Sequence, residues 1–392
     1  MLFSSRTGWP PNPNRLSELV RERRERGVPI LDLMESNPTR CGFALDAEEI
    51  LAPLNDRRAL TYEPDPRGLL TAREAVAQYY AERGIPLNPD QIFLTASTSE
   101  AYSFLFRLLA NPGDCILAPQ PSYPLFDFLG GLNDVKILPY PLVYDEGWRV
   151  DLEGLASQAE SRCPAVLAVH PNNPTGSYVQ RRELVRITEI CCRSRAALIA
   201  DEVFADYALT ADPDRVVSHA QASDALTFTL SGLSKIVALP QMKLAWIVVN
   251  GPQELRRDAQ VRLEVIADTY LSVSAPVALA TPRWLAQRHE IQSQILERVQ
   301  ANLRKLDALL ARGLPVSRLK VEGGWYTILR VPSTRSDEDW AVELLTEESV
   351  LVHPGHFYDF PSEGFLVLSL LPPPGSFEET LRKVISRICA QS

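Results

Sequence analysis

The feature that most constrains this chain is a series of short, almost purely apolar runs that alternate with segments of helical spacing. The runs lie at residues 91–95, 115–118, 165–169, 197–200, 226–230 and 244–249. A strand that is apolar along its whole length is typical of a parallel sheet covered on both faces by helices. The sequence therefore predicts an α/β fold around such a sheet.

The pattern changes after about residue 250. Long helical segments at 252–267 and 284–312 are followed by apolar strands at 325–331 and 364–370, which indicates a smaller α/β unit. A chain of 392 residues also suits two domains. We expect an N-terminal arm (1–14) with part of the small domain up to residue 45, a large domain at 46–272 and a small C-terminal domain at 273–392, with a helix at 16–26 and a strand at 30–33 near the start.

Composition excludes several classes of protein. The net charge of -9 leaves no basic surface for nucleic acid. No stretch approaches the roughly 18 apolar residues of a membrane span, and the first residues lack a signal-peptide core. Six cysteines in a chain of this length form no disulfide framework, and the adjacent Cys191 and Cys192 lack metal-ligand spacing. We expect reduced thiols and a cytoplasmic protein.

Polar side chains follow four of the apolar runs. Lys235 comes after 226–230; such a lysine is usually a surface residue, but a buried lysine of lowered pKa can form a Schiff base. Asp201 comes after 197–200 and suits either a helix cap or a protonated ring nitrogen. The amide of Asn173 suits a turn or a ligand. Because ligands of open α/β sheets bind at the carboxyl ends of strands, these groups are expected to meet.

The fourth junction is Ala96-Ser97-Thr98-Ser99-Glu100, between a predicted strand and a predicted helix. Ser97 reads equally well as an ordinary helix cap. However, the N–H groups at a helix N-terminus also form a phosphate site, to which hydroxyls can add. The junction alone does not decide between these two readings.

Taken in order, the motifs resemble the class I/II aminotransferases of pyridoxal-phosphate fold type I. The motifs that carry the resemblance are Tyr62…Gly68, Thr95-Ala96-Ser97-Thr98, Pro121-Ser122-Tyr123-Pro124, Asn172-Asn173-Pro174-Thr175-Gly176, Asp201-Glu202-Val203 and Ser234-Lys235. The resemblance implies pyridoxal phosphate on a mostly parallel seven-stranded sheet, and a homodimer with sites at the subunit interface. It also implies amino-group transfer from an amino donor to a keto acid or aldehyde.

The resemblance further implies a role for each matching residue. Lys235 would form the Schiff base and move the proton during catalysis. The other roles are the ring nitrogen for Asp201, the ring oxygen O3′ for Asn173, stacking on the ring for Tyr123, the phosphate for Ser97, Thr98 and Ser234, the neighbouring subunit's phosphate for Tyr62, and a substrate-side loop for Asn37-Pro38 and for Gly323-Gly324.

Four positions depart from the family pattern. Phe204 stands where a tyrosine donates to O3′, and Lys243 stands where an arginine binds phosphate. Gly232 replaces a hydroxyl residue, and Val367 replaces the arginine that binds the substrate carboxylate. Either the substrate lacks that carboxylate or another cation binds it, with Arg40 as the first candidate and Arg330 as the second.

Two alternatives to aminotransfer remain at this stage. Fold type I also hosts carbon–sulfur lyases, decarboxylases and synthases, because a fold does not fix the reaction. Some transcription regulators use an aminotransferase-like domain as a ligand sensor, but they carry a DNA-binding domain ahead of it. Here the segment before residue 45 is too short for such a domain.

Overall fold

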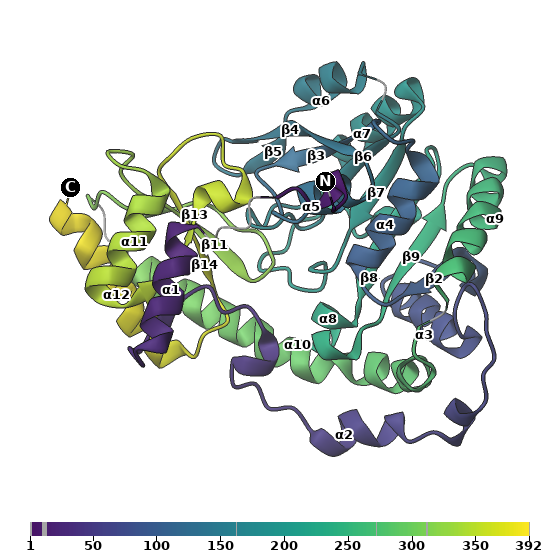
Figure 1. The fold of residues 1–392 in the computed structure, drawn as a ribbon, viewed down its shortest axis with the longest axis horizontal. Helices are drawn as coiled ribbons and strands as arrows, with labels where there is room; N and C mark the ends of the chain where they lie inside the picture. Colours follow the sequence, from purple (N-terminus) through teal and green to yellow (C-terminus); the bar gives the residue numbers. More distant parts are fainter. Residues whose placement is uncertain (1, 10–13, 162, 272, 311–312, 392) are drawn as a thin grey trace.

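A mostly parallel sheet lies at the centre of the computed structural model, which describes residues 2–9, 14–161, 163–271, 273–310 and 313–391 (Figure 1). In spatial order its strands are β2 (Ile92–Thr95), β9 (Ala245–Asn250), β8 (Thr227–Gly232), β7 (Ala197–Asp201), β6 (Ala165–Val169), β3 (Cys115–Gln120), β4 (Lys136–Tyr144) and β5 (Trp148–Val150). The family resemblance implied seven strands, and the apolar runs had located six. The two strands that the runs did not locate are β4 and the short β5, which folds back antiparallel on β4.

The direction of the strands determines where polar side chains gather. Strands β4, β3, β6, β7 and β8 pair in parallel, whereas β9 runs antiparallel to both β8 and β2. The carboxyl ends of the five parallel strands therefore lie along one edge of the sheet. The loops that leave this edge carry the motifs marked in the sequence.

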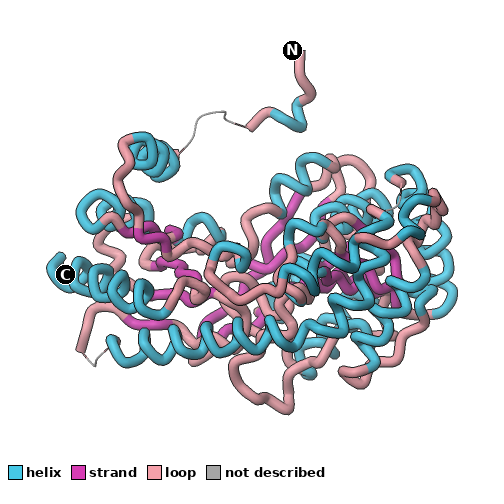
Figure 2. Tube along the Cα trace, turned by 90° about the horizontal axis from the view of Figure 1, so that it is seen from below, coloured by secondary structure: helices cyan, strands magenta, loops and turns pink. Residues whose placement is uncertain are grey.

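Helices cover both faces of the sheet, and Figure 2 shows the strands between layers of helices. Successive residues of β7 point to opposite faces: Ile199 packs with α4 and α9, whereas Leu198 packs with α6 and α7. This arrangement explains why the strands are apolar throughout. The helices around the sheet are α3 (Leu70–Ala81), α4 (Thr98–Leu109), α5 (Phe126–Leu132), α6 (Leu152–Ala159), α7 (Arg181–Ser194), α8 (Leu233–Ile236) and α9 (Gln253–Tyr270).

A smaller unit packs beside the sheet. Its antiparallel sheet has the order β10 (Ser317–Arg318), β11 (Tyr326–Arg330), β14 (Phe365–Ser369) and β13 (His353–Pro354), and β1 (Leu31–Asp32) pairs with β12 (Val350–Leu351). Its helices are α1 (Arg15–Glu25), α11 (Asp337–Glu348) and α12 (Pro374–Gln391). The short helix α2 (Ala47–Leu51) lies in the segment between β1 and α3. The pairing of β1 with β12 joins the N-terminal segment to the C-terminal unit, as expected.

The long helix α10 (Ala275–Leu309) connects the two units, because it packs against both α3 and α12 (Figure 1). It begins nine residues earlier than the expected residue 284, and the expected end at 311–312 lies outside the described residues. Part of the expected arm, residues 10–13, also lies outside them. In the described part of the arm, the Arg6 guanidinium pairs with Asp134 at the end of α5.

The expectation that all cysteines are free is wrong for two of them. Cys115 and Cys163 form a disulfide, with their Cα atoms 4.8 Å apart. Cys115 begins β3 and Cys163 lies two residues before β6, and these strands are neighbours in parallel register. The sequence does not reveal this adjacency, since 48 residues separate the two cysteines. Cys41, Cys191, Cys192 and Cys389 are free.

Candidate active site

Lys235 lies in the short helix α8, directly after β8. Its Nζ atom is 4.8 Å from the centre of the Trp325 ring and 5.3 Å from the centre of the Phe204 ring. Burial lowers the pKa of this lysine to about 8, although the Asp201 carboxylate opposes the shift. A lysine in this setting is partly neutral near physiological pH, which a nucleophile and proton carrier requires.

Asp201 is the last residue of β7 and is 7% exposed. Its Oδ2 accepts a hydrogen bond from the Tyr102 hydroxyl at 2.7 Å, and its Oδ1 accepts one from the backbone N–H of Val203 at 3.1 Å. Burial raises the pKa of Asp201 to about 6, although these hydrogen bonds lower it in part. The carboxylate is therefore ionised at neutral pH and can pair with a cationic ring.

Asn173 follows β6 and is 8% exposed. Its Oδ1 atom is buried without a hydrogen-bond partner among the described residues. Buried amides are normally paired, so an unpartnered one at the carboxyl end of a central strand indicates a place for a ligand. Its neighbour Asn172 differs, because it bonds to Ser122, Thr175 and the carbonyl of Pro121.

Ser97 is the N-cap of α4, and its Oγ accepts from the backbone N–H of Glu100 at 3.1 Å. The cap reading of this junction is thus realised, and it does not compete with the phosphate reading. The first N–H groups of an α-helix have no partner within the helix, so the start of α4, at Thr98, can still bind an anion. A phosphate contact of Thr98 remains a prediction.

Two of the positions that depart from the family pattern, Gly232 and Lys243, lie around α8. A Cβ added to Gly232 would lie 2.8 Å from the Cβ of Ala245, so serine or threonine does not fit there without movement. Lys243 is exposed and left-handed (φ 53°), at the end of the turn that follows α8. Ser234 is partly buried in α8, beside Lys235.

Aromatic side chains surround the predicted place of the cofactor ring. Phe204 is buried against Trp325, with ring centres 5.2 Å apart. Tyr207 is not a substitute donor for the cofactor, because its hydroxyl donates to the backbone carbonyl of Lys235 at 2.6 Å. Tyr123, expected to stack on the cofactor ring, is 36% exposed and meets Phe126 edge-on.

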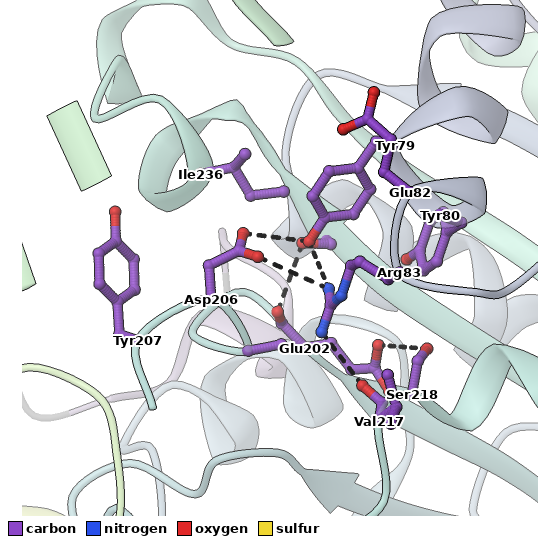
Figure 3. A network of polar contacts seen from close by, with 12 residues as sticks. Tyr79, Tyr80, Glu82, Arg83, Glu202, Asp206, Tyr207, Val217, Ser218 and Ile236 are labelled. Carbon is purple, nitrogen blue, oxygen red and sulfur yellow. Dashed lines mark hydrogen bonds and ion pairs between the residues drawn. The ribbon is translucent and has the colours of Figure 1, made fainter. Parts of the chain in front are cut away.

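A buried polar network, drawn in Figure 3, surrounds Asp206 and reaches the chain at Lys235 and Ile236 through hydrogen bonds to their carbonyls. Tyr79 and Arg83, from α3 and the turn that follows it, converge on Asp206, where the Tyr79 hydroxyl donates at 3.1 Å and Arg83 pairs at 3.8 Å. Gln292 of α10 donates both to Asp206 and to the carbonyl of Ile236. The hydroxyl of Tyr207 also donates to the carbonyl of Lys235, so two successive backbone carbonyls, those of Lys235 and Ile236, are held by buried side chains.

A second part of this network surrounds Glu202, the residue after Asp201. Its carboxylate accepts from the Ser218 hydroxyl and from the backbone and ring of His219, at 2.6–2.9 Å. The side chain is fully satisfied and buried, so it does not face a ligand. In the Asp-Glu motif the first carboxylate belongs to the site and the second supports the loop.

The substrate side is less crowded with polar groups. Asn37 caps the turn Pro38–Arg40, since its Oδ1 accepts from the N–H and the hydroxyl of Thr39. Arg40 is exposed, and its guanidinium has no partner among the described residues. Val367 is fully buried among apolar side chains, which include Ile328, Tyr358 and Phe360.

Four further residues divide into two that the sequence marked, Arg330 and Tyr62, and two that it did not. Arg330 sits at the far end of β11 from Tyr326, over the rings of Tyr144 and Phe365. Tyr62 is 72% exposed, so it contributes nothing to the buried site of its own chain. Trp325 and Tyr102 were missed. Trp325 directly follows the marked pair Gly323-Gly324, whereas Tyr102 looks like an ordinary core residue of α4.

Residues 32–388 match the family profile of aminotransferase class I and II. The chain belongs to this family. The glutamate-pyruvate aminotransferase AlaA of Haemophilus influenzae is 28% identical over 370 residues, covering 92% of this chain and 91% of that protein. An S-alkyl-thiohydroximate lyase of Arabidopsis thaliana is also 28% identical, covering 79% and 69%.

Solved structures agree with the family at the level of the fold. An Escherichia coli aminotransferase superimposes with a TM-score of 0.86 at 24% identity, covering 99% of this chain and 98% of the other. An alanine aminotransferase from Pyrococcus furiosus gives 0.86 at 22% identity, covering 98% and 99%. The expected fold type is therefore confirmed. The family match over residues 32–388 makes the chain a pyridoxal-phosphate-dependent aminotransferase.

The residues present fit that cofactor. The NH2 group of the buried Asn173 side chain can donate to the ring oxygen, the ionised Asp201 suits the ring nitrogen, and the start of α4 suits the phosphate. Lys235 lies between these groups and the aromatic wall. Among the described residues, no helix is both long and apolar enough to cross a membrane.

Proposed function

We propose that this aminotransferase moves the amino group of an α-amino acid to an α-keto acid, with Lys235 as the catalytic lysine. The observation that carries the proposal is the position of the Lys235 amine against Trp325 and Phe204, beside the buried carboxylate of Asp201. The name of the Haemophilus relative, a glutamate-pyruvate aminotransferase, supports an amino acid and a keto acid as the substrate pair.

Each residue has a distinct task in this proposal. When bound, pyridoxal phosphate supplies a ring that withdraws electrons from the substrate's Cα. Asp201 holds the ring nitrogen, Asn173 donates to O3′, and Tyr123 covers one face of the ring. The neutral Lys235 Nζ would accept the proton from the substrate's Cα and hold it for return to the reacting group. The phosphate is held by Ser97, Thr98, Ser234 and Lys243.

Borohydride reduction of the holoenzyme tests the assignment of Lys235. Reduction should fix the cofactor to a peptide that contains Lys235, as read by mass spectrometry. Lys235→Ala should retain cofactor through Asp201 and the phosphate site but should not turn over. Finding the reduced cofactor on Lys243 instead would overturn the assignment.

Arg40 is the cation that we propose for the substrate carboxylate. Its guanidinium is free of other partners, and Val367 offers a carboxylate nothing. Since a lost charge-assisted contact weakens binding, Arg40→Ala should raise KM for an amino-acid donor about tenfold or more while cofactor absorbance stays intact. The matched control is Arg257→Ala, which removes an exposed arginine of α9, and Arg330→Ala tests the second candidate cation. An unchanged KM for every active amino acid would exclude Arg40.

A second candidate function is carbon–sulfur lyase activity, because one relative carries that name. It would use the same Lys235 and Asp201. A screen of donors separates the two reactions: aminotransfer yields a keto acid and the aminated cofactor, whereas a lyase releases a thiol. Thiol release without the aminated cofactor would favour the lyase.

We also propose a cytoplasmic homodimer with domain boundaries near residues 45 and 272. The exposed Tyr62 supports the dimer, since a residue that meets the phosphate in the family has no ligand in its own chain. The pairing of β1 with β12 supports the assignment of the first segment to the small domain.

A further inference from the structure

We propose that the Tyr102 hydroxyl is a dedicated donor that orients the Asp201 carboxylate and keeps it ionised beneath the cofactor. The inference rests on the proposed role of Asp201 in holding the ring nitrogen. Tyr102 touches neither substrate nor cofactor in this scheme, so it is a positioning residue. It acts through Asp201.

The geometry leaves the Tyr102 hydroxyl little freedom. The residue lies on α4, is 2% exposed and donates to Asp201 Oδ2 at 2.7 Å. Its ring is held by Phe126 at 5.4 Å, nearly perpendicular, and by Phe106 at 5.9 Å. Because Val203 donates to the other oxygen, both carboxylate oxygens have one fixed donor each. The plane of the carboxylate is therefore determined from two elements.

A packing role alone does not account for a hydroxyl at this place. The neighbours of Tyr102 in α4 that face the same core are apolar, namely Ala101, Leu105 and Phe106. Phenylalanine would fill that space, and a buried hydroxyl is unfavourable unless it is hydrogen-bonded. The single bond that Tyr102 makes with its hydroxyl goes to Asp201.

The charges around Asp201 make its ionisation sensitive to one donor. Lys235 faces it from α8, Tyr123 from the loop after β3, and Glu202 follows it in the chain. Burial already raises the pKa of Asp201 to about 6, with Lys235 and Tyr102 opposing and Glu202 adding to the shift. The pKa of Tyr102 itself lies well above its usual value because of burial, so the hydroxyl stays a donor throughout.

The sign of the expected effect follows from these charges. A carboxylate that loses a donor binds its proton more tightly. Asp201 in Tyr102→Phe would therefore become neutral at a higher pH than in the wild type and would lose its attraction for a cationic ring there. Above that pH the two proteins would bind the cofactor alike.

The experiment measures the dissociation constant of pyridoxal phosphate from the apo form of the full-length protein, by quenching of intrinsic fluorescence, from about pH 5 to about pH 9. In Tyr102→Phe the pH at which affinity falls should move up by about one unit or more. Tyr140→Phe is the matched control, because the buried Tyr140 hydroxyl donates at 2.7 Å to the carbonyl of Leu167 and not to Asp201. It should leave that pH unchanged.

The outcomes separate this inference from the function on which it rests. A uniform loss of affinity at every pH in Tyr102→Phe, with no shift, would reduce Tyr102 to a packing role and overturn the inference. Asp201→Asn should bind weakly and lose the pH dependence. If Asp201→Asn instead binds as the wild type does, the proposed role of Asp201 fails first, whatever Tyr102 does.

Discussion

At the residue scale, the absence of one hydroxyl at position 204 changes the electronics expected of the site. Phe204 offers the cofactor no donor, and Tyr207, three residues on, is committed to the backbone of Lys235. Asn173 is therefore left as the donor that the described residues offer to O3′. This leaves the negative form of that oxygen less stabilised than a phenol would make it.

Replacing Phe204 with tyrosine tests this view. The new hydroxyl should donate to O3′, and a hydrogen bond to a charged group is worth about 1.5–3 kcal/mol. The new hydroxyl should favour the form in which the Lys235 nitrogen carries no proton. In that form O3′ bears a full negative charge that no neighbouring N–H neutralises, so a hydrogen-bond donor stabilises it most. The midpoint of a spectrophotometric pH titration of the holoenzyme should fall. Phe360→Tyr, in the separate apolar cluster around Val367, is the control; an unchanged or higher midpoint in Phe204→Tyr contradicts the geometry.

Residues of the site differ in how far the sequence reveals them. Lys235, Asp201 and Asn173 follow apolar strands, so strand ends and polar residue type together mark them as candidates, and the family resemblance supplies their predicted roles. Tyr102 was hidden because a tyrosine on an apolar helix face reads as core, and only the fold shows that this face meets the end of β7. Trp325 comes from the small unit, whose approach to β8 the sequence does not specify.

At the element scale, the sheet was predictable and its margins were not. Continuous apolar runs predict the central strands, because both of their faces are covered. The edge strand β5 has three residues, of which one is buried and two are half-buried, and so short a segment resembles a loop in the sequence. The disulfide between the start of β3 and the residues before β6 depends on strand order, which local patterns do not contain.

The network between α3, α10 and the loop after β7 should be a major contributor to stability. Arg83 pairs with Asp206, and both side chains are largely buried. Removing one partner of a buried pair leaves an uncompensated charge and destabilises by about 3–5 kcal/mol. Arg83→Met should show this loss in urea unfolding. Arg262→Met removes an exposed ion pair with Asp258 on α9, for which about 0–1 kcal/mol is typical. Equal losses of unfolding free energy in the two variants would show that the buried Arg83 network stabilises the protein no more than an exposed ion pair does.

At the scale of the whole molecule, the exposed position of Tyr62 is the feature that bears on the proposed dimer. Tyr62 lies exposed ahead of α3, and the loop after it is held in place by Arg73, which bonds to Asp65 and to the carbonyl of Gly68. Gly68 is left-handed, and a Cβ there would lie 2.7 Å from Leu94. The loop is thus rigidly built, yet it presents Tyr62 to solvent. A second copy of the chain is the partner that the family resemblance implies.

Mixing two inactive variants tests whether Tyr62 serves the other subunit. Lys235→Ala lacks the catalytic amine, and Tyr62→Ala should be weakened in cofactor binding and activity. In a mixed dimer, the intact Lys235 of one chain would face the intact Tyr62 of the other, so one of the two sites would be whole. Random reassembly after dissociation should then restore about a quarter of wild-type activity, since half of the dimers are mixed and each has one whole site.

Mixing Lys235→Ala with Asp201→Asn gives the contrasting control, because both residues belong to the same chain's site. In that mixed dimer each of the two sites would lack one group, so no activity should return. Tyr62→Ala combined with Lys235→Ala in the same chain, mixed with wild type, would damage both sites of the mixed dimer. Activity in that last mixture equal to the simple share of wild-type chains would show that Tyr62 does not cross to the partner.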